Sequence, residues 1–153
     1  MIEAILLLSD PALINDLEAV LVEANPRLNI YPIHRLEALN ALDTATLGKA
    51  RLLSFGGEII VPNAILRRLG GGAYNFHPGP PNRPGRFPSC FFIFDLLDAD
   101  GTLKPNGDRR FGSTVHEMAA QVDSGAINAV NWFELPPDLA ASIDRRTLDA
   151  LSF

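Results

Sequence analysis

The sequence is poor in groups that would cross-link or anchor the chain. Cys90 is its one cysteine, so no intrachain disulfide can form, and a reducing, cytoplasmic location is the default expectation. Because Phe91 and Phe92 follow Cys90, we expect this thiol to be a small buried side chain. The apolar run Ile2–Leu8 is too short to span a bilayer and has no basic residues before it, so neither a membrane helix nor a signal peptide is expected. Such a run is typical of a buried strand.

Positive charge is also scarce. The chain carries 13 Lys and Arg against 18 Asp and Glu, which gives a net charge of −5. A protein that coats nucleic acid needs a clustered excess of Lys and Arg, so general nucleic-acid binding is not expected. The 153 residues are 47% hydrophobic and 20% charged, as is ordinary for a globular protein. We therefore expect residues 1–153 to form a single domain.

The first third of the chain alternates between strand and helix patterns. Helical spacing of apolar residues predicts helices from about Leu13 to Glu23 and over Leu36–Leu47, while short apolar runs predict strands at Ile2–Leu8, Leu28–Ile33 and Arg51–Phe55. Strands that alternate with helices build a mostly parallel sheet flanked by helices, the Rossmann-like α/β class. In such sheets ligands bind beyond the carboxyl ends of the strands, which directs attention to the residues after Phe55.

The remaining two thirds are predicted to continue less regularly. The prolines of His77–Gly85 exclude regular structure there, and Asp98–Asp108 predicts a polar loop. The other predicted elements are helices at Asn63–Leu69, Ser89–Leu97 and Asp138–Leu151, and strands at Ala73–Phe76 and Ala126–Phe133. The segment Thr114–Gln121 has a strand pattern at its start and an ambiguous pattern after it.

Asn75 and His77 are the first candidates for chemistry. Alternate side chains of a strand share a face, so both are expected to point the same way at the exit of the strand, with Tyr74 and Phe76 on the opposite face. An amide can donate to an oxyanion, and a protonated imidazole can add charge stabilisation. Taken alone, the pair is more simply explained as a capping Asn and a turn His.

Asp123 is the third candidate. It precedes Ser124 and Gly125, a combination that on its own indicates an ordinary turn. The functional interpretation is that a loop delivers this carboxylate to the same site as Asn75 and His77.

Three motifs occur together in a fixed order. They are Asn75-x-His77-Pro78, Gly112-x-Thr114-Val115-His116 and Asp123-x-Gly125-x-Ile127. In this order and spacing they resemble the folate-dependent formyltransferases, the family that includes glycinamide ribonucleotide, methionyl-tRNA and sugar N-formyltransferases. The resemblance covers about Arg51 to Ile127 and implies a compact formyltransferase-like version of the predicted α/β fold.

The resemblance also implies a reaction and a site. The chain would transfer the formyl group of 10-formyltetrahydrofolate, its co-substrate, to an amino group of a small acceptor, phosphorylated or nucleotide-linked. By motif position, Asn75 would donate to the oxyanion, His77 would stabilise it, and Asp123 would hold His77 and help to move protons. No metal is implied. The loop that would cradle the folate consists of Phe55, Gly56, Gly57, Ile59, Ile60, Val61 and Pro62.

Two other functions stay open at this point. Water could replace the amine, which would make the chain a formyltetrahydrofolate hydrolase. A non-catalytic folate-binding or interaction module could also keep the three motifs without turnover. The expected partners are the folate and a small amine acceptor, with no membrane, and a homodimer is compatible with the sequence. We expect His116 to pack or to support the site rather than to catalyse.

Overall fold

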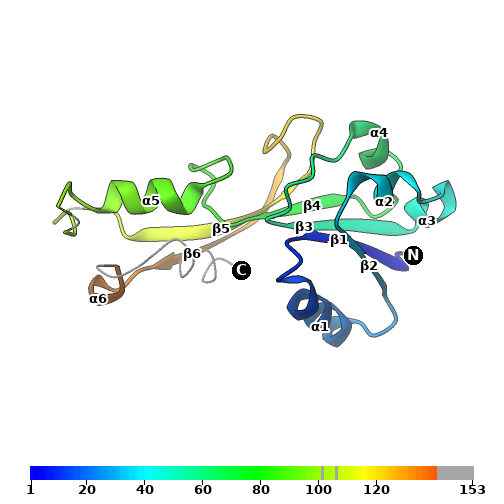
Figure 1. Cartoon of the computed structure of the whole chain (residues 1–153), viewed down its shortest axis with the longest axis horizontal. Coiled ribbons are helices and arrows are strands. Elements are labelled where there is room, and N and C mark those ends of the chain that lie inside the picture. Colours follow the sequence, from blue (N-terminus) through cyan, green and yellow to red (C-terminus); the bar gives the residue numbers. More distant parts are fainter. Residues whose placement is uncertain (101, 106, 141–153) are drawn as a thin grey trace. The chain divides into compact units, whose positions relative to one another are not determined.

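The computed structural model describes residues 1–100, 102–105 and 107–140 of the chain. These residues form a six-stranded, mostly parallel sheet in the order β2-β1-β3-β4-β5-β6, with flanking helices (Figure 1). The predicted α/β fold class is therefore confirmed. The described residues group into two compact units, one made of Met1–Phe76 with His116–Ala126, the other of His77–Val115 with residues 127–140.

The first unit holds the parallel part of the sheet. Its strands are β1 (Ala4–Ser9), β2 (Asn29–Ile33), β3 (Ala50–Phe55) and all but the last residue of β4 (Ala73–His77), and its helices are α1 (Ile14–Ala24), α2 (Leu36–Asn40), α3 (Thr44–Gly48) and α4 (Asn63–Leu66). β1 pairs with β2 and β3, and β3 pairs with β4, all in parallel. The carboxyl ends of β1, β3 and β4 consequently meet at one edge, because Ser9 aligns with Phe55 and Phe55 with Phe76.

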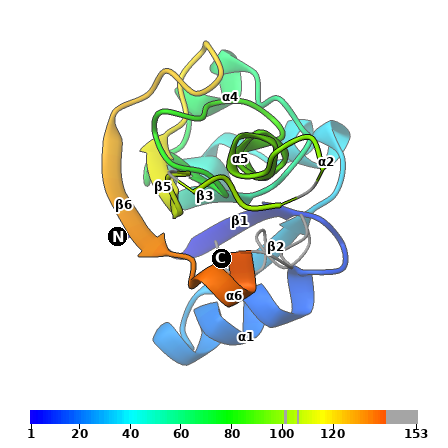
Figure 2. The same cartoon turned by 90° about the vertical axis from the view of Figure 1, so that its left-hand side faces the viewer.

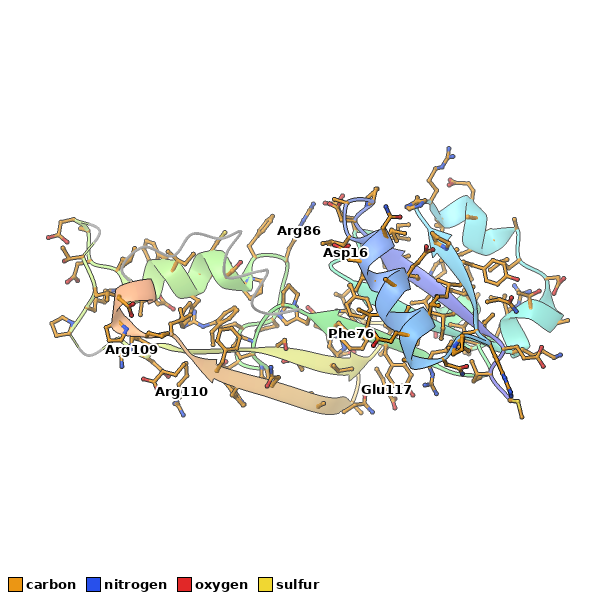
Figure 3. The ribbon with its side chains drawn as sticks, turned by 90° about the horizontal axis from the view of Figure 1, so that it is seen from below. Asp16, Phe76, Arg86, Arg109, Arg110 and Glu117 are labelled. Carbon is orange, nitrogen blue, oxygen red and sulfur yellow. The ribbon has the colours of Figure 1, made fainter. Side chains whose placement is uncertain are left out.

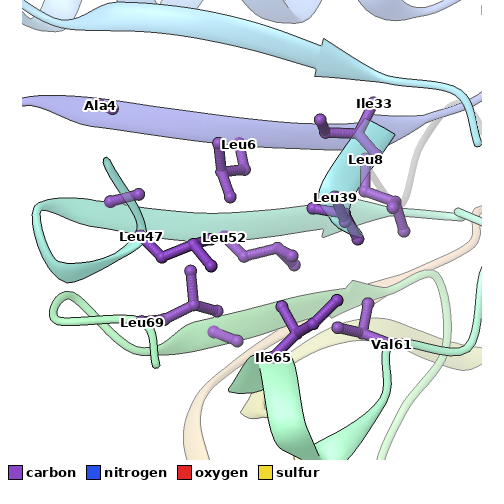
Figure 4. Packing of buried hydrophobic residues seen from close by; sticks show 12 residues of the cluster. Ala4, Leu6, Leu8, Ile33, Leu39, Leu47, Leu52, Val61, Ile65 and Leu69 are labelled. Atoms are coloured by element: carbon purple, nitrogen blue, oxygen red, sulfur yellow. The ribbon is translucent and has the colours of Figure 1, made fainter. Parts of the chain in front are cut away.

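Both faces of these strands are covered. Helix α1 lies on one face, and α2, α3 and α4 lie on the other (Figures 1 and 2). Leu6, Leu8 and Leu52 pack with the α2–α4 side, a cluster seen in Figure 4, whereas Ile5 and Leu7 pack with α1. This double cover explains why β1 is a continuous apolar run and is buried along its whole length.

The single helix predicted over Leu36–Leu47 is wrong, because the segment forms two short helices. The first helix, α2, ends at Asn40, and Asp43 caps α3, since its side chain accepts a hydrogen bond from the Thr46 backbone N–H at 2.7 Å. That backbone hydrogen bond also holds the pKa of the Asp43 carboxyl below its ordinary value. Leu39 and Leu47 still reach the same core, so the leucine spacing predicted burial correctly and helix continuity incorrectly.

The second unit contains α5 (Pro88–Leu96), β6 (Ile127–Glu134), α6 (Pro137–Ala140) and all but the last two residues of β5 (Arg110–Glu117). Its core joins Phe92 and Leu96 of α5 to Phe111 of β5 and to Leu135. Because α5 turns Phe92 and Leu96 inward, Cys90 falls on its outer side and is exposed, so the predicted burial of this thiol is wrong. The predicted helix Asp138–Leu151 lies outside the described residues from residue 141 onward.

Candidate active site

Asn75 lies in the middle of β4, one residue before the end of the first unit. It aligns with Ser54 of β3. The next residue, Phe76, stacks on Phe55 with ring centroids 4.1 Å apart, and Phe55 packs with the α1 side of the core (Figure 3). Since side chains alternate along a strand, Asn75 faces the α2–α4 side. The prediction that Asn75 and Phe76 point to opposite faces is thus in agreement with the packing.

The side chain that Asn75 meets is His116. The Asn75 Nδ2 atom lies 3.2 Å from His116 Nε2, although the two residues are 41 positions apart in the sequence. The other ring nitrogen of His116, Nδ1, lies 2.9 Å from the backbone oxygen of Glu117. The His116 residue is only 6% exposed, so protein groups rather than bulk water set the hydrogen bonding of the ring.

Asp123 approaches the same imidazole. Its Oδ1 atom lies 3.4 Å from His116 Nε2, and its side chain is 21% exposed. The first unit thus brings together an amide, an imidazole and a carboxylate around one nitrogen atom, from β4, β5 and the loop after β5. This is a compact set of groups that can donate hydrogen bonds, accept them and move a proton.

The loop that presents Asp123 is held close to the end of β5. Glu117 donates its backbone N–H to Ala126 O at 2.9 Å, and a Cβ at Gly125 would overlap the Glu117 carbonyl oxygen. Asp123 itself adopts φ 55°, a left-handed conformation that Asp tolerates better than most residues. Asp123 is therefore both a turn residue and a carboxylate at the cluster, and its side-chain chemistry must be tested by a substitution that preserves the turn.

His77 belongs to the second unit. It is 7% exposed, and its Nε2 atom lies 2.9 Å from the backbone oxygen of Arg83, which fixes a hydrogen on Nε2 because a carbonyl only accepts. A Cβ at Gly79 would approach His77 Nε2 to 2.7 Å, so glycine leaves space for the ring. The proposed pairing of His77 with Asp123 stays a prediction.

Thr114 fixes the segment that follows His77. Its hydroxyl donates to Gly79 O at 2.7 Å in a buried setting within the second unit. Replacing Thr114 by Val keeps the shape and leaves this carbonyl without its donor, so we expect a loss of about 1–3 kcal/mol in the free energy of unfolding. Chemical denaturation measures it, with Thr114→Ser as the matched control that keeps the hydroxyl. An unchanged stability of the Val variant would show that water replaces the threonine.

The predicted folate loop follows β3 in the first unit. Residues Gly57–Pro62 lie outside helices and strands, and Pro62 at the end of the loop caps α4, where its carbonyl accepts from the Ile65 and Leu66 amides. Val61 is buried in the core and Ile59 packs against it, while Ile60 is 72% exposed. A Cβ at Gly57 would overlap Leu8 Cδ2, so this glycine is required for packing against β1. Of the three apolar residues Ile59–Val61, Ile60 is the one whose side chain is open to a ligand.

His116, which the sequence predicted to pack or to support the site, is the residue that Asn75 and Asp123 both approach. The signal was present, because Gly112, Thr114 and His116 occupy alternate positions of β5 and are all buried. A histidine at a buried alternate position needs polar partners. Spacing did not predict which partners it finds, since Asn75 lies 41 positions away in the sequence and Asp123 approaches the ring through the turn after β5.

In the part of the chain that the structure describes, no three His, Cys, Asp or Glu side chains are grouped so as to hold a metal ion. Within the same residues, no helix has the length and apolar character needed to cross a membrane.

The chain is similar to known proteins in its structure and not in its sequence. No family model and no curated protein matches the chain in sequence. A sugar N-formyltransferase from Shewanella sp. FDAARGOS_354 is structurally similar, with TM-score 0.58, 19% identity and coverage of 97% of this chain and 65% of that one. HypX from Aquifex aeolicus, in complex with tetrahydrofolic acid, gives TM-score 0.63 and 17% identity over 88% of this chain and 22% of that one.

A third similar structure contains a folate and a nucleotide-linked amino sugar. The N-formyltransferase from Helicobacter canadensis, in complex with folinic acid and dTDP-3-aminofucose, gives TM-score 0.56 and 14% identity over 98% of this chain and 62% of that one. The chain spans less than two thirds of each of these three proteins. The architecture that the motifs predicted is the one that these formyltransferase-family structures share, and the chain has the folate-dependent formyltransferase fold.

Proposed function

We propose that this chain transfers a formyl group from 10-formyltetrahydrofolate to the amino group of a small acceptor. The observation that carries the proposal is the cluster of Asn75, His116 and Asp123 at the end of the parallel sheet. Two further observations support the proposal: the chain has the fold of the formyltransferases, and the irregular loop Gly57–Pro62 follows β3. Ligands of open α/β sheets bind at this edge.

The proposed chemistry needs an oxyanion stabiliser and a group that moves protons. 10-Formyltetrahydrofolate supplies the formyl group, whose carbon gains a bond to the acceptor nitrogen and loses its bond to the folate nitrogen. Asn75 donates through Nδ2 to the formyl oxygen as negative charge develops there. Asp123 assists the proton transfer in which the amine nitrogen loses a proton and the departing folate nitrogen gains one. The role of His77, charge stabilisation of the same oxygen, rests on its place in the Asn75-x-His77-Pro78 motif.

We propose a nucleotide-linked amino sugar as the acceptor. Two of the similar structures are N-formyltransferases, one described as acting on sugars and the other holding dTDP-3-aminofucose with folinic acid. The stretch from Asn75 to Pro81, with Pro84-Gly85 after it, also looks most like the sugar-formylating and related branches of the family. Both points favour an amino sugar over a large acceptor such as tRNA.

The deciding experiment mixes the protein with 10-formyltetrahydrofolate, with and without dTDP-linked amino sugars, and follows loss of the formyl group. Turnover that requires the amine supports the proposal. Turnover without any amine would replace it by hydrolysis of formyltetrahydrofolate. Neither turnover nor binding of folinic acid would replace it by a non-catalytic interaction module.

Ile60 provides a separate test of the folate loop. We expect Ile60→Ser to weaken binding of folinic acid by about 1–2 kcal/mol, or roughly 5–30-fold in Kd, because the apolar contact of an isoleucine is lost. Stability should change little, since the side chain is 72% exposed. Calorimetric titration measures the affinity.

Val20→Ser on α1, where the residue is 63% exposed, is the matched control for Ile60 and should leave the affinity unchanged. Equal affinities for both variants and the unaltered protein would place the folate elsewhere. Gly57 is unsuitable for this test, because a side chain there would disturb Leu8 in the core.

A further inference from the structure

A backbone carbonyl determines which nitrogen of the His116 imidazole carries a hydrogen. Its Nδ1 atom lies 2.9 Å from Glu117 O, and a carbonyl oxygen only accepts hydrogen bonds. Nδ1 therefore carries a hydrogen whether the ring is neutral or protonated. A neutral His116 then has a lone pair on Nε2 and no hydrogen there.

This lone pair selects one of two orientations of the Asn75 amide. The oxygen and nitrogen ends of an amide exchange on a half-turn about its bond, and the hydrogen-bond partner decides which end faces it. Nε2 of a neutral His116 can only accept, so it takes a hydrogen from Asn75 Nδ2, 3.2 Å away. The ring is 6% exposed, so bulk water is a poor substitute for this partner.

We infer that His116 is a positioning residue that holds the Asn75 amide with its nitrogen in place to donate. The inference rests on the proposed function, because that function assigns the donor role to Asn75. Nδ2 has two hydrogens; His116 takes one, and the other is available to the formyl oxygen. A half-turn of the amide would put an oxygen, which cannot donate, where this nitrogen stands.

The charged groups near His116 show that the Asn75 amide keeps this orientation as long as His116 Nε2 carries no hydrogen. Asp123 Oδ1, from the loop after β5, lies 3.4 Å from Nε2, and the Glu117 side chain that follows His116 is exposed. A hydrogen on Nε2 would point to the Asp123 carboxylate or to a rotated Asn75, so it would remove the reason for the amide to present its nitrogen. Gly125 keeps the Asp123 loop against the same Glu117 carbonyl that anchors Nδ1.

The direct test is the state of the ring, read by long-range proton–nitrogen NMR correlations at slightly alkaline pH. The sequence has three histidines, so the signals of His116 are those lost in His116→Gln. We expect the Nδ1 shift of a protonated-type nitrogen and the Nε2 shift of a bare one. The opposite pattern would overturn the inference. This readout needs no substrate, so it stands even where the protein transfers no formyl group and the proposed function fails.

The kinetic test compares two replacements of His116. Gln can place an oxygen near the former Nε2 and accept from Asn75, whereas Leu cannot accept at all. We expect His116→Leu to lower kcat by about 10²-fold with KM for the folate nearly unchanged, since misplacing a catalytic group by about 1 Å has this effect. His116→Gln should recover most of the rate, and His34→Gln at an exposed position should retain all of it.

Equal kcat values for His116→Leu and the unaltered protein would overturn the positioning role, and so would a rise in KM at constant kcat. Thermal melts of each variant separate a folding defect from a catalytic one. If His116→Leu does not fold, the comparison of His116→Gln with the unaltered protein and the NMR pattern still decide the matter.

Discussion

Replacing Asp123 by Asn is expected to slow formyl transfer by about 10²–10⁴-fold while the melting temperature stays nearly constant. A group that moves protons contributes this range of rate, or about 3–6 kcal/mol at about 1.4 kcal/mol for each factor of ten. Asn keeps the size of the side chain but removes the negative charge that lies 3.4 Å from His116 Nε2. Stability should hold, because Asn adopts the left-handed backbone at φ 55° as readily as Asp does.

Asp43→Asn is the matched control for this substitution. It makes the same chemical change at the cap of α3, where Asn also caps well, so both activity and stability should survive. If the Asp123→Asn protein retains full activity, then Asp123 is a turn residue only. The comparison therefore separates the two interpretations that the Asp-Ser-Gly sequence left open.

Replacing Asn75 by Leu is expected to lower kcat by about 10²–10³-fold, because one donor to the developing oxyanion is lost. This corresponds to about 3–4 kcal/mol of transition-state stabilisation. KM for the folate should change little, since the donor acts mainly on charge that appears during the reaction. Steady-state kinetics with 10-formyltetrahydrofolate and an active acceptor measures both constants.

The Asn75→Leu protein should also be less stable, by about 1–3 kcal/mol, because His116 Nε2 loses the amide that donates to it. Asn29→Leu, at the exposed amino end of β2, is the control for replacing an amide by an apolar side chain. A kcat equal to that of the unaltered protein would exclude Asn75 as the oxyanion donor.

Local sequence patterns predicted the structure correctly where all residues of a segment have the same degree of burial. The apolar run at the N-terminus predicted β1, since a strand covered on both faces is apolar at every position. The alternation of Tyr74, Asn75 and Phe76 predicted which side chains share a face. The same reasoning was wrong at Leu36–Leu47, because the Asp43 cap starts a new helix within an otherwise periodic run. It was wrong at Cys90, where neighbouring phenylalanines suggested burial but the inward face of α5 excludes the thiol.

The sequence by itself determined the order of the strands along the chain, the mostly parallel class of the sheet, and the presence of Asn75, His77 and Asp123 in motifs typical of formyltransferases. The tertiary structure alone decided that Asn75 and Asp123 meet at His116. Asn75 lies 41 positions from His116 and reaches it through the arrangement of the strands, and the approach of Asp123 depends on the turn at that residue. The tertiary structure also decided that Gly57 serves packing and that Ile60 is exposed. Periodicity reports how one residue relates to its neighbours in an element, whereas the partner of a buried polar atom is set by which distant element packs against it.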